Sequence, residues 1–362
     1  GPATVYVHHY YENPADTSGK SAYPNETRGK KGIAVDLKNP SGKAVIEKLI
    51  PRSDILIYNV RPKAMARLGL SYEDVRSLNP KIIYVGAYGY SEKGPRAGRA
   101  AYDDLIQGST GVPWLVSKEG RENPRYVPLN FADRVTGLHA VYAVTSALYQ
   151  REKSGRGQSI EVPMFESVSH FVLGDHMAGL SFQPPIGPSG YERLKHRRVY
   201  ETKNGFICAL VYNEAQWTRF WVAMNKPEMM DDPKFITHAA RAQNIGEIYD
   251  LLSGIIKGQD TEYWMEFFQD VDVPVAKMNT VDDLLTDEHL LETGFFRNEQ
   301  HPTEGALYAT KTPSNWSESS PERVTPAPSL GQHTREVLRN LSYNDAEIDS
   351  LIEARAVSDG IE

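Results

Sequence analysis

The spacing of apolar residues in the first hundred positions alternates between strand and helix periods. An alternating run at Ile33–Leu37 predicts a strand, and apolar residues at helical spacing predict a helix over Ser41–Ile50. The continuous apolar run Ile55–Tyr58 is typical of a strand that is buried on both faces. The alternation continues with helices over Ala64–Leu68 and Tyr72–Leu78 and a strand over Ile82–Val85. Strands that alternate with helices predict an α/β fold with a parallel sheet.

The middle of the chain continues with longer helices. Residues 102–107 read as a short helix, and residues 135–150 as a long one. The long helix carries one stripe, made of Leu138, Val141, Tyr142, Thr145 and Leu148. A strand at Ser159–Val162 and a helix over residues 164–179 follow it.

The pattern changes at Gln183–Pro188, whose prolines and glycine indicate a linker. Beyond it, Asn204-Gly205 separates two strand-like runs and predicts a β-hairpin of 199–202 with 206–211. Helices are expected over residues 214–224, 239–257 and 261–270, then a loosely patterned stretch at 302–328 and a final helix at Thr334–Asn340. These residues predict a second, smaller α+β domain.

The domain prediction follows from these changes of pattern. We expect residues 1–185 together with 315–362 to form a large Rossmann-like domain. Residues 199–300 form the small domain, and 186–198 and 301–314 are linkers. A chain of 362 residues is long for one hydrophobic core, which agrees with two domains.

Composition narrows the function classes. A formal charge of −7 gives no electrostatic reason to expect binding to nucleic acid or to a membrane surface. The single cysteine, Cys208, rules out an intrachain disulfide framework and fits a reducing compartment. No apolar run reaches the roughly 18 residues of a membrane span, and no signal-peptide pattern opens the chain. We therefore expect a soluble cytoplasmic protein.

The familiar site motifs are absent from the sequence, and one carboxylate is left as a candidate. There is no glycine-rich phosphate loop and no GxSxG elbow, and the ten histidines lack metal-ligand spacing, so no metal is expected. Asp133 lies where a long apolar helix is predicted to begin. Its carboxylate can serve as an N-cap, or it can act as a nucleophile, and spacing alone leaves both interpretations open.

A series of blocks in the chain resembles the family III CoA-transferases (the CaiB/BaiF family, with formyl-CoA transferase and the α-methylacyl-CoA racemases). The blocks fall in family order from about residue 28 to the C-terminus, and their number makes the resemblance specific. They are Arg28-Gly29-Lys30-Lys31, Ile33–Lys38, Asn59-Val60-Arg61-Pro62, Leu68-Gly69-Leu70, Asn79–Tyr84, Arg99–Asp103, Ala132-Asp133 with Thr136-Gly137, Arg151–Gln158, Glu161–Met164 and Leu330–Thr334.

The resemblance implies the chemistry of the carboxylate. Asp133 matches the family's catalytic position, and it would attack an acyl-CoA thioester to give an acyl-aspartyl anhydride. The CoA thiolate would then form an aspartyl-CoA thioester, from which CoA passes to an acceptor carboxylate. The family also implies two ring-like subunits that interlock as a homodimer, with CoA held mainly by the large domain.

Further site residues are carried over by position. The resemblance implies that CoA contacts Val35, Lys38, Asn59, Val60 and Arg67. For Lys38 and Arg67 the alternative is a solvated surface charge. Asp103 and its neighbour Tyr102 match positions near the active site, and the alternative for Asp103 is a helix cap.

The chain departs from the family pattern at three places. Tyr102 stands where the racemases carry histidine, and a phenol of pKa near ~10 is a poor acid/base at the α-carbon, which favours transfer over racemisation. The segment Val211–Gln216 replaces a glycine-rich loop of formyl-CoA-type enzymes, so oxalate and formate are not assumed. The family's opening strand and helix are shortened before Val5. If residues are missing there, part of the CoA site is missing too.

Two alternatives to CoA transfer therefore stay open. One is an acyl-CoA racemase or epimerase of the same superfamily, and the other is a CoA-binding protein without catalytic activity. The acid and the acyl group are not determined by the sequence. Trp114, Phe171 and Tyr212 can line a substrate pocket, but core packing is the favoured role for each.

Overall fold

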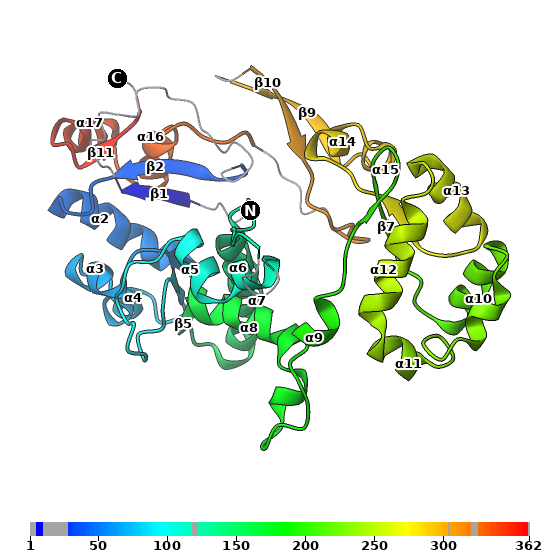
Figure 1. Ribbon diagram of the computed structural model, residues 1–362. Helices are drawn as coiled ribbons and strands as arrows, with labels where there is room; N and C mark the ends of the chain where they lie inside the picture. The colour runs from blue at the N-terminus through cyan, green and yellow to red at the C-terminus, as the bar shows by residue number, and fades with distance from the viewer. Residues whose placement is uncertain (1–4, 10–27, 118–121, 303–304, 320–324, 361–362) are drawn as a thin grey trace. The chain divides into compact units, whose positions relative to one another are not determined.

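The chain folds as two units in the computed structural model, which describes residues 5–9, 28–117, 122–302, 305–319 and 325–360 (Figure 1). The first unit consists of Gly1–Thr110, Pro128–Val168 and Glu288–Glu362, and the second of Gly111–Val127 and Ser169–Asp287. These limits differ from those of the domains predicted from the sequence, which remain a prediction.

The first unit has two three-stranded sheets with helices packed on them, as the α/β pattern predicts. Its elements are β1 (Val5–His9), β2 (Lys31–Val35), α2 (Pro40–Leu49), η1 (Ile50–Arg52), β3 (Ile55–Tyr58), α3 (Pro62–Arg67), α4 (Tyr72–Leu78), β4 (Ile83–Tyr88), α5 (Asp103–Ser109), α7 (Phe131–Ser154), β5 (Gln158–Pro163), α15 (Glu288–Glu292), β9 (Phe296–His301), β10 (Gly305–Thr310), α16 (Thr334–Asn340), α17 (Asp345–Glu353) and β11 (Val357–Ser358). Helix α8 (Met164–His176) passes from this unit into the second.

Parallel pairing organises both sheets. Strands β3, β4 and β5 lie side by side in parallel, and β1 is parallel to β2. The C-terminal strand β11 pairs antiparallel with the other edge of β2, so the tail of the chain completes the first sheet. Since all strands of the β3–β4–β5 sheet run the same way, their carboxyl ends meet at one edge, where open α/β sheets bind ligands.

Two strands show how position in the sheet overrides composition. The prediction that Ile55–Tyr58 is buried on both faces is wrong, because Ile57 is 58% exposed and Ile55 36%. Strand β3 is an edge strand, and only its Leu56 and Tyr58 pack against the core. The central strand β4 is instead buried along most of its length.

Helix α7 presents its small residues to the sheet. Ala140 and Ala147 pack with Ile83, Val85 and Val162 of β4 and β5. Of the predicted stripe, Leu148 packs against this cluster, whereas Leu138 is 69% exposed, Val141 61% and Tyr142 55%. A sheet surface already filled by branched residues leaves room for alanine, and Leu138, Val141 and Tyr142 lie on the outer face of the helix.

The C-terminal segments contain more regular structure than their pattern predicts. The stretch predicted to be loose contains β10, which pairs antiparallel with β9, and Phe296 stacks on Tyr308 across the hairpin, with centroids 4.7 Å apart. The predicted final helix Thr334–Asn340 is confirmed as α16, but α17 follows it. Helix α17 begins with a capping box of Asn344 and Glu347, a signal that is readable in the sequence.

The second unit is held together by aromatic residues. Its elements are α6 (Val112–Val116), η2 (Ala178–Ser181), α9 (Tyr191–Leu194), β6 (Tyr200–Glu201), β7 (Phe206–Ala209), α10 (Glu214–Ala223), η3 (Pro227–Asp231), α11 (His238–Gln243), α12 (Ile245–Ile256), α13 (Thr261–Asp270), β8 (Val275–Lys277) and α14 (Val281–Leu285). Trp217, Trp264 and Phe268 are almost fully buried in its core. The predicted hairpin is confirmed as β6 and β7, whereas the predicted helix over 239–257 is two helices that meet at Asn244.

The block Arg151–Gln158 contacts the amino end of the β3–β4–β5 sheet. The guanidinium of Arg151 donates to the backbone carbonyls of Asp54 and Lys81, at 3.3 and 3.2 Å, and pairs with the Asp54 carboxylate at 2.9 Å. Gly157 lies so close to β4 that a Cβ atom there would be 2.0 Å from the Ile82 carbonyl oxygen. This block therefore ties α7 to strands β3, β4 and β5.

We predict opposite effects on stability for two glycines of this unit. Gly157→Ala forces backbone apart and should lower the free energy of unfolding by about 1–3 kcal/mol. Gly137→Ala in α7, where no atom outside the local helix backbone lies within 4 Å of the added Cβ, should raise it by up to about 1 kcal/mol. Urea unfolding followed by circular dichroism measures both, and equal effects would contradict the packing assigned to Gly157.

Among the described residues, no helix has the length and apolar character that would let it cross a membrane.

Candidate functional site

Asp133 lies in the first turn of α7, with its side chain exposed. The helix begins at Phe131, earlier than the sequence predicts, and the N-cap residue is Asn130, which makes no side-chain capping bond. The interpretation of Asp133 as the N-cap is therefore wrong. A carboxylate in a first helical turn still benefits from the positive end of the helix dipole.

The cap of α7 comes from another helix. The backbone N–H of Asp133 donates to Oδ1 of Asp103 at 3.0 Å, and Asp103 is the first residue of α5. The other oxygen, Oδ2, accepts from Nε2 of Gln107 at 2.6 Å. The structure thus brings Asp103 and Asp133 together across 30 positions of sequence. Asp103 acts as a helix cap, as one interpretation held, but for α7 rather than for its own helix.

Tyr102 precedes Asp103 at the N-cap position of α5, and its side chain is 74% exposed. Among the described residues, its hydroxyl makes no hydrogen bond. The phenol is therefore accessible to a ligand, and it lies next to Asp103 at the start of α5. Its role in the reaction stays a prediction.

The predicted CoA residues follow the carboxyl ends of β2 and β3. Asn59 and Val60 come directly after β3 and are exposed. Lys38 is exposed beyond β2, and its backbone N–H donates to Oδ1 of Asp36 at 2.9 Å. Val35 is fully buried at the end of β2, so its side chain belongs to the core and only its backbone is left for CoA.

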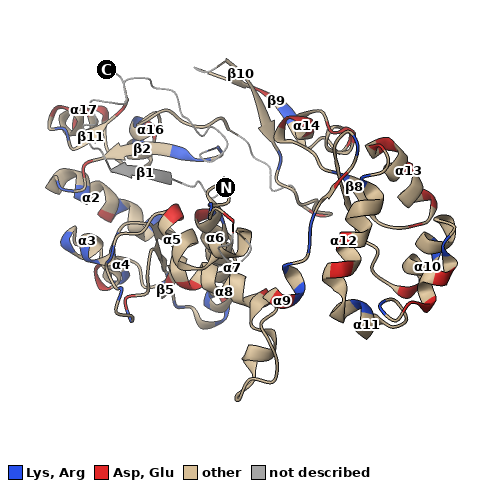
Figure 2. Cartoon of the chain, in the orientation of Figure 1, with Lys and Arg blue, Asp and Glu red and all other residues tan. Residues whose placement is uncertain are grey.

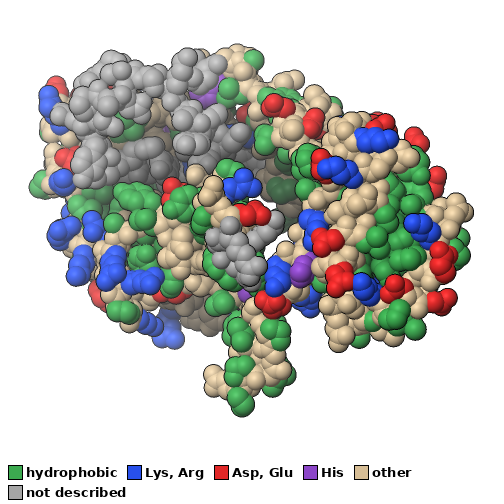
Figure 3. Space-filling model, in the orientation of Figure 1, with side chains coloured by type: hydrophobic (Ala, Val, Ile, Leu, Met, Phe, Trp, Pro, Cys, Tyr) green, Lys and Arg blue, Asp and Glu red, His purple; other side chains and the backbone are tan. Residues whose placement is uncertain are grey.

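Positive charge collects on α3. Arg67 is exposed in the last turn of this helix, Lys63 is exposed within it, and Arg61 is its N-cap residue. Figure 2 shows the basic residues along α3, and Figure 3 shows blue side chains gathered over it. Such a group suits phosphate oxygens, although the CoA contact of each residue stays a prediction.

A carboxylate of β5 fixes the loop that leads from β4 to Tyr102. Glu161 accepts from the Tyr88 hydroxyl at 2.9 Å, from the Ser91 hydroxyl at 2.9 Å and from the backbone N–H of Glu92 at 2.6 Å. The loop then returns so that Gly89 lies against Ala101, where an added Cβ would be 2.3 Å from the alanine methyl. Glu161 therefore holds the start of the segment that ends at Asp103.

A cluster of tyrosines joins β3 and β4. The ring centroids of Tyr58 and Tyr84 are 5.0 Å apart, those of Tyr58 and Tyr88 6.2 Å. Burial raises the pKa of all three hydroxyls above the usual 10.0, and the Glu161 carboxylate raises the pKa of Tyr88 further. The fold thus holds these phenols neutral.

We predict that alkaline pH destabilises the first unit through these tyrosines. Because their pKa values are raised on folding, their contribution is fully present below pH 10.0, the unfolded value, and is lost as pH rises through the higher folded values. The free energy of unfolding, measured in urea between pH 8 and 11, should fall above about pH 10. Tyr58→Phe should make this fall less steep, with the exposed Tyr308→Phe as the control; equal slopes would contradict the assignment.

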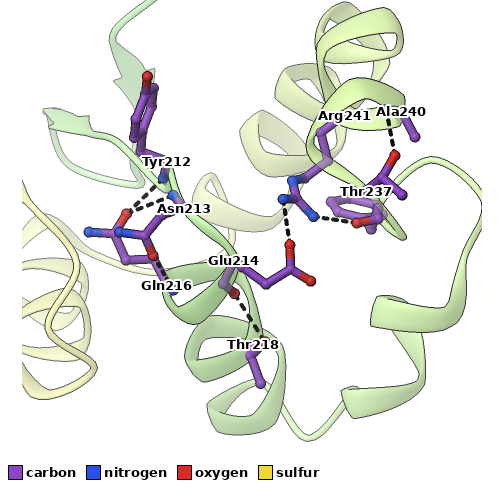
Figure 4. A network of polar contacts seen from close by, with 9 residues as sticks. Tyr212, Asn213, Glu214, Gln216, Thr218, Thr237, Ala240 and Arg241 are labelled. Atoms are coloured by element: carbon purple, nitrogen blue, oxygen red, sulfur yellow. Dashed lines mark hydrogen bonds and ion pairs between the residues drawn. The ribbon is translucent and has the colours of Figure 1, made fainter.

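The segment after β7 is fixed by polar contacts, as Figure 4 shows. Oε1 of Gln216 accepts from the backbone N–H groups of Tyr212 and Asn213, at 2.9 and 3.2 Å, and Asn213 caps α10 in return. The buried Arg241 pairs with Glu214 at 2.7 Å and donates to the Phe235 carbonyl. The segment after β7 therefore leads into a helix start with its own side-chain cap.

Three aromatic residues lie at the surface instead of in the core. Trp114 is 47% exposed, Phe171 55% and Tyr212 65%, so the expectation of core packing is wrong for each. Trp114 contacts the buried Tyr191 at 4.7 Å between centroids, and Tyr212 lies edge-on to His238 at 6.4 Å. Exposed aromatic rings are available for contact with a ligand or another chain.

A cavity of about 450 Å³ is lined by none of the predicted site residues. It is at the amino end of the β3–β4–β5 sheet and is lined by Pro51, Arg52, Ser53, Asp54, Asn79, Lys81, Arg151, Glu152 and Gly155. Ligands of open α/β sheets bind at the opposite, carboxyl end. In the described ranges, no group of His, Cys, Asp and Glu could hold a metal ion.

Gln107 was missed by reasoning from the sequence. It is fully buried and contacts Asp103, yet a lone glutamine in a short helix carries no recognisable pattern. The only available signal was its spacing of four residues from Asp103, which places both side chains on one helix face.

Comparison with known proteins identifies the family. Residues 6–334 match CoA-transferase family III. A succinyl-CoA:glutarate CoA-transferase of Mus musculus is 28% identical over 90% of this chain and 75% of its own length. A formyl-CoA:oxalate CoA-transferase of Bradyrhizobium sp. is 26% identical over 91% of this chain and 82% of its own.

A solved structure has the same fold. The crystal structure of a CaiB/BaiF family protein from Brucella suis superposes with a TM-score of 0.76 and 25% identity, covering 94% of this chain and 92% of that one. The family match spans most of the chain, and the fold and the relatives agree with it. This chain belongs to CoA-transferase family III and is an enzyme of CoA transfer.

Proposed function

We propose that this enzyme moves CoA from an acyl-CoA donor to a free carboxylic acid, with the carboxylate of Asp133 as the nucleophile. The observation that carries the proposal is the bond from the Asp133 N–H to Asp103, because it fixes the helix turn that bears the carboxylate. The side chain itself is exposed to an incoming thioester. A held and accessible carboxylate is what nucleophilic catalysis requires.

The first half of the reaction attaches CoA to the enzyme. An Asp133 oxygen adds to the thioester carbonyl carbon, the C–S bond breaks, and CoA leaves as a thiolate while an acyl-aspartyl anhydride forms. The thiolate then adds to the aspartyl carbonyl carbon. The donor acid leaves as a carboxylate, and an aspartyl-CoA thioester remains.

The second half repeats these steps with the acceptor. An oxygen of the acceptor carboxylate displaces the CoA thiolate and forms a new anhydride, and the thiolate then attacks the acceptor's acyl carbon. This releases the new acyl-CoA and restores the Asp133 carboxylate. Each step exchanges one acyl bond for another without net proton transfer or redox change, and the amino end of α7 favours the negative charge that develops on oxygen.

The basic helix α3 and the residues after β2 and β3 support the binding of CoA. Arg61, Lys63 and Arg67 offer donors to phosphate oxygens, and Asn59 and Val60 present exposed side chains next to the same strand end. CoA is a substrate here, and the proposed chemistry needs no metal. Relatives that act on different acids share this chain's family, so the acid is left to experiment.

We predict that Asp133→Asn lowers the rate of transfer by on the order of 10³-fold or more, because an amide is a poor nucleophile. The substitution keeps the side-chain volume and the backbone N–H that Asp103 accepts. The wild type and the variant are incubated with succinyl-CoA and other acyl-CoAs in the presence of glutarate, oxalate and other acids. Mass spectrometry reads the exchanged thioesters, and Asp104→Asn on α5 is the control. Near-normal turnover by the Asp133 variant would contradict the mechanism.

The same assay separates the alternatives. Deuterium uptake at the α-carbon of the acyl-CoA without an acceptor acid would identify a racemase or epimerase, which the phenol at Tyr102 disfavours. Binding of CoA without exchange or deuterium uptake would identify a non-catalytic CoA-binding protein.

The outer face of α7 supports a second copy of the chain as partner. Leu138, Val141, Tyr142 and Tyr149 form an apolar stripe with exposures of 69, 61, 55 and 65%. Apolar patches of this kind usually mark an interface. We infer a homodimer that covers this stripe, in agreement with the interlocked dimer that the family resemblance implies.

The dimer gives a separate prediction. Val141→Glu with Tyr142→Glu should convert the dimer to a monomer, because burial of two charges without partners opposes association. Size-exclusion chromatography with light scattering measures the mass, and Glu152→Lys, an exposed change on the same helix, is the control. A wild-type monomer, or a variant that stays dimeric, would contradict this interface.

A further inference from the structure

Gln107 is a fully buried polar side chain that contacts Asp103 and the segment entering α7. Buried polar groups in folded proteins are held by hydrogen bonds, since leaving them unmade is costly. The amide nitrogen Nε2 donates to Oδ2 of Asp103 at 2.6 Å and to the backbone carbonyl of Leu129 at 3.3 Å. One amide group thus joins α5 to the segment that enters α7.

The carboxylate of Asp103 is therefore held at both oxygens. Oδ2 receives the Gln107 amide while Oδ1 receives the Asp133 N–H at 3.0 Å. The terminal torsion of an aspartate is broad, so a carboxylate with one donor can rotate. A second donor on the opposite oxygen fixes the plane of the carboxylate, and with it the position of the Oδ1 atom that accepts from the Asp133 N–H.

The bond to Leu129 acts on the segment that enters the same helix. Its carbonyl also accepts from the Phe131 N–H at 2.7 Å, and Asn130 provides no side-chain cap. Two hydrogen bonds thus position the start of α7. Asp103 accepts from the Asp133 N–H, and Gln107 donates to the Leu129 carbonyl. Both contacts depend on the place of one glutamine amide.

We propose that Gln107 is a positioning residue for the reaction, which acts through Asp103 and Leu129 to hold Asp133 against the thioester carbon. The inference rests on the proposed function, since it assigns a task to a residue near the proposed nucleophile. Gln107 does not touch the reacting atoms. Displacement of a reactive group by about 1 Å can lower a rate by on the order of 100-fold, which sets the scale of the effect.

The test compares two substitutions that keep the size of the side chain. Gln107→Glu replaces the donor by a second carboxylate beside Asp103, and Gln107→Met removes the polar group. Asp104→Asn, an exposed change on α5, is the matched control. Each protein is mixed with succinyl-CoA or with the acyl-CoA that the wild type exchanges fastest, and hydroxylamine traps the acylated enzyme. Mass spectrometry of the Asp133 peptide gives the rate and the final amount of trapping.

A positioning role predicts a slower rate with an unchanged final amount. The rate of trapping should fall about tenfold to 100-fold in Gln107→Glu and by less in Gln107→Met, while KM for the acyl-CoA stays within about twofold. A merely structural role lowers the fraction of folded enzyme, so the final amount falls and the rate constant does not. If both quantities fall, the rate constant decides, because it is measured on the folded fraction.

The outcomes also separate this inference from the proposed function. A wild-type protein that is never trapped at Asp133 would contradict the nucleophile itself. A trapped wild type with unchanged rate constants in both Gln107 variants would contradict only the positioning role.

Discussion

The contact between the Asp103 carboxylate and the backbone N–H of Asp133 joins two helices through residues that lie 30 positions apart in the sequence. Helix α7 begins without a side-chain cap of its own, so its first turn takes its acceptor from α5. The carboxylate of Asp133 therefore lies on a helical turn that is positioned by α5. An aspartate that capped its own helix would use its oxygens for backbone N–H groups. Because Asp103 of α5 caps α7, the helix end can be stable while the Asp133 side chain has a separate chemical role.

Helix α7 meets different demands along its length. Its amino end carries the proposed nucleophile, its small residues fit the branched side chains of β4 and β5, and its carboxyl end leads into the Arg151–Gln158 block. The remaining face carries large apolar residues that the sheet does not cover. One helix can therefore couple the site, the sheet and the proposed subunit interface, since a shift against any of them moves the others.

The blocks that identify the family differ in what they do. Arg151 and Gly157 fix strand ends far from the chemistry, because the arginine satisfies backbone carbonyls and the glycine permits close approach. Glu161 fixes the loop after β4. Only some of the family's blocks bear on the reaction itself, and resemblance alone does not separate them. Contacts in the structure make that distinction.

Local pattern was sufficient for much of the secondary structure. Strand β3, helix α4, helix α13 and helix α16 begin and end where the sequence predicts, since their apolar spacing, and for α4 its capping box, is encoded within a few residues. The sequence by itself also determined the family and the candidate Asp133, through ordered blocks rather than through periodicity.

Tertiary structure decided what depends on neighbours distant in sequence. Burial of β3 depended on its place at a sheet edge, and the inner face of α7 on the space that β4 and β5 left free. The bonds of Asp103 to Asp133 and Gln107 arise only when α5 and α7 meet, and no local signal encodes that meeting. Packing decides which distant segments form hydrogen bonds with each other. The residue types of the site could therefore be read from the sequence, but their arrangement could be read only from the fold.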